Sequence, residues 1–466
     1  MVFSSLTFLF LFLPILYLLY FISPSARWRN GVLVAMSLLF YGWGEPIWIL
    51  AMLFSTLVNY FCARALTRTG DERARRRILT VGIIASVAFL FYFKYSAFLL
   101  NSFAALFRLA WRMREPGLPI GISFYTFQIL TYSVDVYRKK APALDNPLRL
   151  LLYISCFPQL IAGPIVQYGD IADQLAERSV AVEDFTAGMQ RFIKGLAKKV
   201  LLANVCGAAL QELTMAGSGA ALSVGGAWLA AFLYGQQIYF DFSAYSDMAI
   251  GLGRTMGFHY KENFDFPYAS LSVTEFWRRW HISMGSFFRD YIYIPLGGNR
   301  RGTGRTILNL LIVWALTGLW HGASWNFVLW GAYFGVLLIL ERFVLKRAID
   351  AAPKPLRWAV TFTIVTVSWV IFYYTDLPAL GVHLRAMIGI GASGWGDAAA
   401  GAVVRKYTVY PLLCWALSLP LVPCVSQKLS DGARGALGSA LSVVLLAASV
   451  LFLIGQSYNP FIYFRF

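Results

Sequence analysis

Long apolar runs separated by short clusters of Lys and Arg constrain this chain more than any other feature. The runs lie near residues 3–22, 31–43, 46–63, 78–93, 95–111, 118–135, 149–165, 221–240, 306–320, 325–341, 356–374, 407–425 and 437–456. Several fall short of the roughly 20 residues that a full crossing of a bilayer needs. Short or re-entrant helices are tolerated at membrane depth only where protein or a water-filled cavity satisfies the backbone. The pattern predicts an all-α polytopic membrane protein that includes such helices.

The composition agrees with a membrane protein and excludes a nucleic-acid-binding one. Hydrophobic residues make up 58% of the chain and charged residues only 14%, whereas soluble proteins carry roughly 25% charged residues. The chain has 40 Lys and Arg but only 23 Asp and Glu. The basic residues fall in short loops, as the positive-inside rule describes. A soluble nucleic-acid-binding protein would concentrate these residues on one polar face. We expect a single integral-membrane domain over residues 1–466 that contacts membrane lipid. We expect no nucleic-acid partner.

The distribution of basic residues also predicts an orientation. Basic clusters at residues 27–29 and 64–77 contrast with the uncharged-to-acidic turn at residues 41–46, which places the N-terminus outside. Later basic stretches, including residues 278–305, are then cytoplasmic. The topology of residues 95–150 does not resolve, because arginines both precede and follow one apolar run there.

Histidine is rare in this chain, which has four, and His321 has the most informative surroundings. It lies in the polar segment TGLWHGASWN, residues 317–326, between two apolar runs whose far ends are both basic. If both ends are cytoplasmic, His321 lies at the apex of a membrane hairpin. A titratable side chain at membrane depth is a functional-site hypothesis by default. The alternative is a histidine that only hydrogen-bonds a neighbouring helix.

A second segment, residues 275–301, combines arginines with aromatic residues and His281. Its arginines are Arg278, Arg279, Arg289, Arg300 and Arg301. Guanidinium groups bind phosphates, and aromatic faces suit a nucleobase or a pantetheine arm. We therefore expect these five arginines to bind the acyl donor. A juxtamembrane helix that binds anionic lipid would have the same composition.

Other patterns argue against two further chemistries. The five cysteines show no CxxC or Cys/His ligand spacing, so we expect no metal site. Asp241 and Asp247 are six residues apart in one apolar helix, which turns their side chains to different faces. This spacing does not suit the cooperating carboxylate pair of a glycosidase. We expect one of the two to face a partner or a cavity.

Several segments together resemble those of a known family. They are PIGISFY at residues 119–125, DVYR at 135–138, FPQLIAGP at 157–164, YFDFSAYSD at 239–247, EFWRRWH at 275–281 and GLWHG at 318–322. In combination they are similar to the membrane-bound O-acyltransferases, in particular to the bacterial branch of alginate O-acetylation and teichoic-acid D-alanyl transfer proteins. The resemblance implies that His321 corresponds to the family's catalytic histidine and His281 to its second characteristic histidine.

The resemblance also implies a fold and a reaction. The fold would be a curved bundle of about 10–12 transmembrane helices, thinned around a central funnel. The reaction would move an acetyl group from cytosolic acetyl-CoA, with no permanently bound cofactor, toward an extracellular or periplasmic polysaccharide such as an alginate-like exopolysaccharide. A periplasmic acetyltransferase of the SGNH type would be the partner, and the bacterial inner membrane the location.

Two alternatives stay open at this point. The donor could be an acyl or aminoacyl carrier protein, whose acidic face would also suit the arginines within residues 278–305. A polysaccharide or lipid transporter would be expected to show internal pseudo-symmetry with paired broken helices. The sequence shows no such repeat.

The segment QSYNPFIYFRF, residues 456–466, adds a third candidate, Tyr463. Tyr and Phe commonly anchor a chain at the membrane interface. The spacing Phe461-x-Tyr463-x-x-Phe466 also resembles the C-terminal motif of the small partner protein in D-alanyl transfer. There the resemblance implies that the tyrosine hydroxyl carries the acyl group. A relay through Tyr463 would split one difficult transfer into two, as covalent catalysis does.

Overall fold

The computed structural model describes residues 1–216 and 222–455, whose regular structure is helical. Within these ranges the extended backbone forms an isolated antiparallel bridge, between Phe264 and Trp280. Six helical stretches there are long and apolar enough to cross a membrane: Ile49–Arg68, Glu72–Leu106, Gly302–His321, Trp325–Ala351, Lys354–Tyr373 and Asp431–Gly455. The all-α polytopic architecture is confirmed. The total of about 10–12 crossings around a funnel stays a prediction.

Tertiary contacts divide the chain into two compact units. Unit 1 comprises Met1–Phe192 and Tyr245–Glu262, and unit 2 comprises Ile193–Ala244 and Asn263–Phe466. Two long helices, α10 (Val182–Ala197) and α12 (Val224–Thr255), contribute residues to both units. The expectation of one domain stays a prediction.

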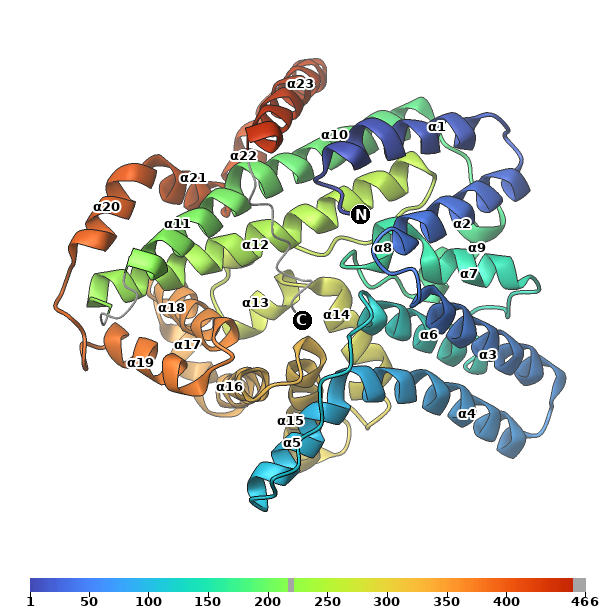
Figure 1. Cartoon of the computed structure of the whole chain (residues 1–466), viewed down its shortest axis with the longest axis horizontal. Helices are drawn as coiled ribbons and strands as arrows, with labels where there is room; N and C mark the ends of the chain where they lie inside the picture. The colour runs from blue at the N-terminus through green and yellow to red at the C-terminus, as the bar shows by residue number, and fades with distance from the viewer. Residues whose placement is uncertain (217–221, 456–466) are drawn as a thin grey trace. The chain divides into compact units, whose positions relative to one another are not determined.

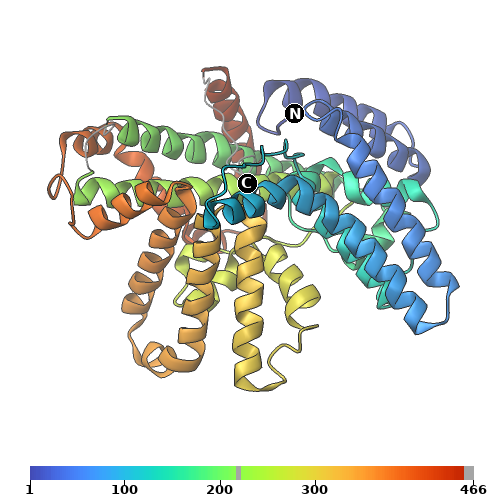
Figure 2. The ribbon, with the colours of Figure 1, turned by 60° about the horizontal axis from the view of Figure 1, so that its bottom comes forward.

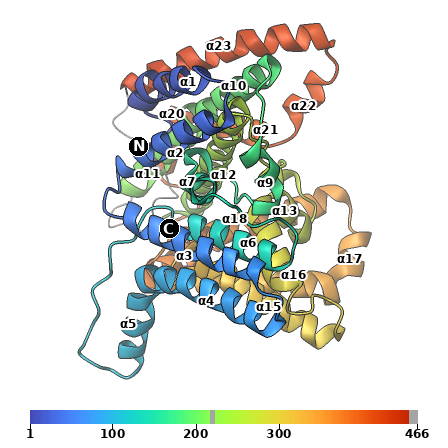
Figure 3. The same cartoon turned by 90° about the vertical axis from the view of Figure 1, so that its right-hand side faces the viewer.

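Unit 1 contains three neighbouring helices joined by buried polar side chains. Its elements, besides parts of α10 and α12, are η1 (Phe8–Phe12), α1 (Leu13–Phe21), α2 (Ala26–Gly42), α3 (Ile49–Arg68), α4 (Glu72–Leu90), η2 (Phe91–Tyr95), α5 (Ser96–Leu106), α6 (Ile122–Tyr137), α7 (Pro147–Ser155), α8 (Phe157–Leu160) and α9 (Tyr168–Ala176). Helices α3, α4 and α6 lie side by side (Figure 3). Ser133 of α6 donates to Asn59 Oδ1 of α3, and Asn59 Nδ2 donates to Ser86 Oγ of α4, each over 2.8 Å. Such bonds join helices where water is absent.

Two apolar runs that appeared separate in the sequence form one helical stretch. The runs 78–93 and 95–111 join through α4, η2 and α5, because no Gly or Pro lies between them and a π-helical turn accommodates the junction. Lys94, which interrupts the apolar pattern, is buried, and its Nζ donates to Ser123 Oγ over 3.2 Å. Helix α6 of the same unit has mostly buried residues. The range 95–150, whose topology the sequence did not settle, therefore begins with the end of one long helical stretch and continues with α6, an interior helix.

Prolines interrupt two other apolar runs. Residues 149–165 form α7 and α8, with Pro158 in the first turn of α8. Residues 407–425 form α21 and α22, with Pro420 directly before α22. Proline has no N–H to donate and is tolerated in the first turn of a helix but not in its interior. These runs therefore supply short helices of the kind that the sequence predicts.

Unit 2 contains the segments that the sequence associates with chemistry. Its elements, besides parts of α10 and α12, are η3 (Lys198–Ala203), α11 (Asn204–Ala216), η4 (Pro267–Ala269), α13 (Val273–Arg279), α14 (Ile282–Phe288), η5 (Arg289–Tyr293), α15 (Gly302–His321), α16 (Trp325–Leu340), η6 (Glu341–Leu345), α17 (Lys346–Ala351), α18 (Lys354–Tyr373), α19 (Leu377–Met387), α20 (Ala398–Tyr407), α21 (Val409–Leu417), α22 (Leu421–Ser426) and α23 (Asp431–Gly455) (Figure 1). Its buried core is rich in aromatic residues from α12, α13, α15, α16 and α18.

The helix pair α15 and α16 forms the expected hairpin, and α18 lies next to α16 (Figure 2). Three residues, 322–324, connect α15 to α16. Gly322 is required there, because a Cβ would lie 2.2 Å from the Phe327 ring. Asn326, at the start of α16, donates from Nδ2 to the carbonyls of Ile371 and Phe372 near the end of α18. The end of α18 is thereby fixed beside the connection of the hairpin.

Candidate active site

His321 is the last residue of α15, so it lies at the connection of the hairpin as the sequence predicts. Its side chain is buried among aromatic rings. The ring centroids of Trp320, Trp330 and Phe372 lie 4.9, 5.0 and 5.2 Å from that of the imidazole, at interplanar angles of 70° to 83°. Aromatic side chains from α15, α16 and α18 therefore surround the imidazole.

His281 occupies a sharp corner between α13 and α14. Its backbone has φ 48°, a left-handed conformation that non-glycine residues rarely adopt. The loop at Asn263 holds this corner: Ile282 N–H donates to the Asn263 carbonyl, and Ser283 donates to Asn263 Oδ1 from both its N–H and its hydroxyl. Left-handed residues held by their surroundings cluster at functional sites.

The same loop orients the imidazole of His281. Its Nδ1 lies 3.1 Å from Asn263 Oδ1, which is an acceptor, so Nδ1 carries the proton and donates it. The opposite nitrogen, Nε2, is buried with no hydrogen-bond partner among the described residues. Burial lowers the pKa of His281 to about 3, which keeps the ring neutral. The His281 ring lies 5.8 Å from that of Trp320, the neighbour of His321. The ring that carries this fixed Nε2 lone pair thus contacts Trp320, the residue next to His321 in the chain.

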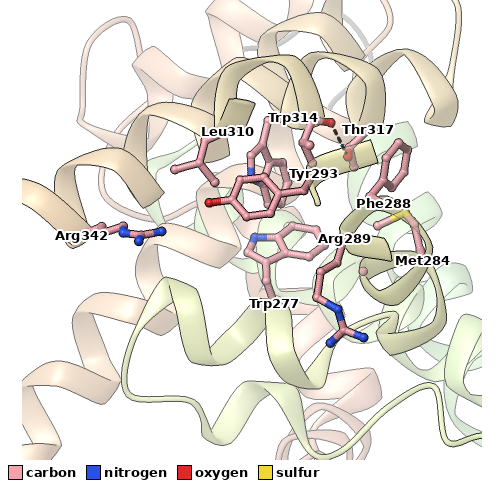
Figure 4. A pocket seen from close by; sticks show the side chains of 11 residues that line it. Trp277, Met284, Phe288, Arg289, Tyr293, Leu310, Trp314, Thr317 and Arg342 are labelled. Atoms are coloured by element: carbon pink, nitrogen blue, oxygen red, sulfur yellow. Dashed lines mark hydrogen bonds between the residues drawn. The ribbon is translucent and has the colours of Figure 1, made fainter. Parts of the chain in front are cut away.

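An apolar pocket of about 250 Å³ lies between α13, α14, η5 and α15. It is lined by Trp277, Met284, Gly285, Phe288, Arg289, Tyr293, Leu310, Val313, Trp314, Thr317 and Arg342. Figure 4 shows the rings of Trp277, Tyr293 and Trp314 gathered in the middle, with the guanidinium groups of Arg289 and Arg342 at the edges. A narrow apolar pocket of this kind suits an alkyl-amide chain better than a charged group.

The lining residues of α15 lead along one face of the helix to His321. Leu310, Val313, Trp314 and Thr317 follow helical spacing, and His321 comes four residues after Thr317. Residues four apart lie on the same face of a helix. From Leu310 to His321 the helix rises roughly 16 Å. The lining of the apolar pocket on α15 thus ends at Thr317, one helical turn before His321.

A second pocket, of about 710 Å³, adjoins the apolar one and is far more polar. It is lined by Ser272, Thr274, Trp277, Arg278, Leu310, Leu338, Glu341, Arg342, Lys346, Ile349, Asp350 and Arg357. The two pockets share Trp277, Leu310 and Arg342. They therefore adjoin each other, with basic side chains in one and mostly apolar side chains in the other.

The charges of this basic pocket favour an anion. One of its carboxylates, Glu341, accepts hydrogen bonds from the N–H groups of Val273 and Thr274, and so caps the start of α13. Arg278, Arg342 and Lys346 form no ion pair within the described ranges. Four basic side chains against two carboxylates leave this pocket with a net positive charge, which suits the phosphates of a ligand.

The structure separates the five arginines that the sequence grouped together. Arg278 lines the basic pocket and Arg289 lines the apolar one, where its guanidinium is bonded to Asp290. Arg279 is paired with Glu275 and Asp265. Arg300 and Arg301 are exposed and line neither pocket. Tyr463 lies outside the described residues.

Sequence reasoning missed several residues of this region. The sequence showed three of them, Arg342, Lys346 and Arg357, only as basic residues that follow the hairpin and indicate its orientation. Two others, Trp330 and Phe372, had the pattern of ordinary core residues. Asn263 belongs to no motif that the sequence singled out. Its role depends on a left-handed corner at His281, which spacing does not reveal.

Asp241 and Asp247 have different partners. Within unit 2, Asp241 Oδ1 lies 2.6 Å from Nζ of Lys199, and both side chains are buried. Within unit 1, Asp247 accepts from Arg191, which also pairs with Glu262. The prediction that one of the two carboxylates faces a partner or a cavity is confirmed, since Asp241 pairs with Lys199 and Asp247 with Arg191.

Comparison with known proteins agrees with this geometry. The profile of MBOAT, the membrane-bound O-acyltransferase family, matches residues 138–380, a range that contains His281, His321 and both pockets. The chain is 39% identical to the probable alginate O-acetylase AlgI of Azotobacter vinelandii and 40% identical to that of Pseudomonas putida, with both chains fully covered in each case. It is 34% identical to the peptidoglycan O-acetyltransferase of Helicobacter pylori, over 84% of this chain and 80% of the relative. The chain therefore belongs to the membrane-bound O-acyltransferase family, as a multi-pass membrane protein.

Proposed function

We propose that this protein transfers acetyl groups from cytosolic acetyl-CoA across the bacterial inner membrane, toward a polysaccharide outside. The names of its relatives, alginate O-acetylase and peptidoglycan O-acetyltransferase, support acetyl as the group and a polysaccharide as its destination. A periplasmic acetyltransferase of the SGNH type would receive the acetyl group and complete the transfer. The excess of basic residues in the loops at the basic pocket supports a cytosolic donor.

The observation that supports this proposal is the pair of adjoining pockets, one basic and one apolar, whose lining on α15 ends one helical turn before His321. Phosphates of CoA would bind Arg278, Arg342 and Lys346 in the basic pocket. The pantetheine arm would follow the apolar pocket along α15. This arrangement directs the thioester toward His321.

His321 would act as a general base on the acceptor. A neutral imidazole titrates near working pH and can accept the proton of a hydroxyl. The hydroxyl oxygen attacks the thioester carbonyl carbon, so a C–O bond forms and the C–S bond breaks. The proton taken by His321 then returns to the departing CoA sulfur. The transfer is complete without any metal or permanently bound cofactor.

His281 would have a supporting role in the same site. Asn263 fixes its ring with Nδ1 protonated, so Nε2 is an acceptor. Its low pKa, about 3, keeps this nitrogen neutral while His321 gains and loses its proton. We assign His281 as a positioning residue beside Trp320.

Tyr463 is the proposed carrier between the two transfers. Its phenol would attack the thioester with His321 as base, since a phenol with a pKa near ~10 is mostly protonated at neutral pH. The aryl ester that results would stay activated for transfer to the periplasmic partner.

The test is incubation of the purified protein in vesicles with acetyl-labelled acetyl-CoA. We expect the label to leave CoA and free CoA thiol to appear, and His321→Ala protein to show neither. A parallel reaction with an acetylated acyl carrier protein tests the alternative donor. Label that leaves only the carrier protein would exclude CoA, and label that leaves neither donor would contradict the proposed reaction.

A further inference from the structure

The ring of Trp330, on α16, contacts the ring of His321 and two rings that line the apolar pocket. Its ring centroid lies 5.0 Å from that of His321, with the two planes at 83°. It also lies 5.5 Å from the ring of Trp277 and 6.3 Å from that of Trp314, which both line the apolar pocket. Trp330 itself is 1% exposed. The indole therefore lies between the ring of His321 and two of the rings that line the apolar pocket.

The indole N–H of Trp330 lacks a hydrogen-bond acceptor. Its Nε1 is buried and has no hydrogen-bond partner among the described residues. The same holds for Trp277 and Trp369, but of these three indoles only that of Trp330 has a ring contact with His321 within the described ranges. Buried tryptophan N–H groups usually find an acceptor, and an exception calls for an explanation. A substrate oxygen that is present only during the reaction provides one.

Neighbouring rings hold this N–H in place. Phe334 and Phe372 lie 5.3 and 5.2 Å from the Trp330 ring, at 78° and 66°. With Trp277, Trp314 and His321 on other sides, the indole is confined by packing. A donor that is fixed before the reaction starts stabilises developing charge without reorganisation.

We propose that the indole N–H of Trp330 binds the carbonyl oxygen of the acetyl thioester and stabilises the oxyanion that forms there. This inference rests on the proposed function. When the acceptor oxygen bonds to the carbonyl carbon, the π electron pair moves onto the carbonyl oxygen, and His321 holds the acceptor's proton. The indole donates to this oxyanion. The C=O bond then re-forms, the C–S bond breaks, and CoA leaves as the thiol with the proton from His321.

The test compares two Trp→Phe substitutions in the same aromatic cluster. Trp330→Phe retains an aromatic ring and removes the N–H. Trp369→Phe is the matched control, because Trp369 is equally buried and, within the described part of the chain, its ring contacts Trp280 and Trp330 but not His321. Membrane vesicles from the native host supply the acceptor, acetyl-CoA is the donor, and released CoA thiol is measured. We expect kcat to fall ~10²- to 10³-fold in Trp330→Phe with KM for acetyl-CoA unchanged. Trp369→Phe should retain the wild-type kcat.

A spectroscopic measurement separates a catalytic donor from a packing residue. Acetyl-CoA labelled with ¹³C at the carbonyl should show a lowered C=O stretching frequency when bound to wild-type protein, and Trp330→Phe should lose this shift. If Trp330→Phe does not fold, benzothienylalanine at position 330 replaces the N–H with sulfur at nearly the same shape and should show the same losses. An unchanged kcat and carbonyl frequency without the N–H would overturn this proposal alone. A wild-type protein that releases no CoA would overturn the proposed function as well.

Discussion

Gly318 of α15 and Gly331 of α16 are in near backbone contact. A Cβ built on Gly331 would lie 3.2 Å from the Cα of Gly318 and 2.4 Å from the carbonyl oxygen of Trp314. Small residues at such crossings allow membrane helices to approach closely. The same approach brings His321 of α15 to Trp330 of α16. The geometry of the site therefore depends on two glycines that contact no substrate.

The first prediction is that Gly331→Ala impairs transfer by separating the hairpin. The added methyl group must displace the α15 backbone, and overpacking of this kind costs about 1–3 kcal/mol. Gly304→Ala is the control, because a Cβ on Gly304 of the same hairpin meets nothing within 4 Å. Acetyl transfer per amount of folded protein should fall in the first variant only. Equal activity of the two variants would show that the hairpin tolerates separation.

The second prediction concerns His321, the proposed general base. His321→Ala should insert and fold, yet lose ~10²- to 10⁴-fold in transfer rate, the usual effect of removing a positioned proton acceptor. His259→Ala is the matched control, since His259 is exposed. Labelled acetate recovered in the polysaccharide measures both variants. Wild-type acetylation by well-expressed His321→Ala protein would refute the assignment.

The sequence predicted the hairpin and its histidine because both follow from local pattern. Two apolar runs with basic far ends and a polar break form a hairpin wherever a membrane surrounds them. His321 was visible for the same reason, as a titratable residue in that break. Helix continuity was harder to predict: Lys94 interrupted the pattern in the sequence, whereas the fold buries it against Ser123.

The donor path could not be predicted from the sequence in the same way. Five arginines close together in the chain looked like one phosphate site, but Arg278 and Arg289 line different pockets, and Arg300 and Arg301 line neither. Arg279 is used in ion pairs, while Arg342 and Lys346 reach the pocket from a distant segment. In the sequence, Arg342 and Lys346 were visible only as basic residues after the hairpin. We used that basic cluster to predict the orientation of the hairpin in the membrane, not a ligand site.

The third prediction is that Arg342 and Lys346 set the affinity for the donor. Their replacement by Gln should raise KM for acetyl-CoA and leave kcat nearly unchanged, because in the proposed function they would contact phosphates far from the thioester. The effect should shrink as salt rises, since exposed charges are screened. Arg300→Gln and Arg301→Gln serve as controls of equal charge change outside both pockets. If Arg300→Gln and Arg301→Gln raise KM for acetyl-CoA instead, the donor binds nearer to η5 and the start of α15.

The fourth prediction uses the pKa of His281. Burial disfavours the charged imidazolium, so the pKa falls to about 3 and the ring is charged only below that pH. His281 should therefore contribute no inflection to the pH–rate profile between about pH 5 and 8, where histidines ordinarily titrate. His281→Gln should lower the rate but keep the midpoint of the acidic limb. A midpoint that moves in this variant would show that His281 itself titrates during turnover.

The last prediction decides the role of Tyr463. As an interfacial anchor, the side chain would need only its ring, whereas a relay needs the hydroxyl that forms the ester. Tyr463→Phe keeps the ring and removes the hydroxyl, so it should abolish polysaccharide acetylation if the relay operates. Tyr458→Phe removes a hydroxyl from the same segment and is the matched control. The relay also predicts a labelled protein: wild type incubated with labelled acetyl-CoA should retain acetyl in a hydroxylamine-sensitive ester, and Tyr463→Phe should retain none. Full acetylation of the polysaccharide by Tyr463→Phe would leave the anchor as the function of this residue.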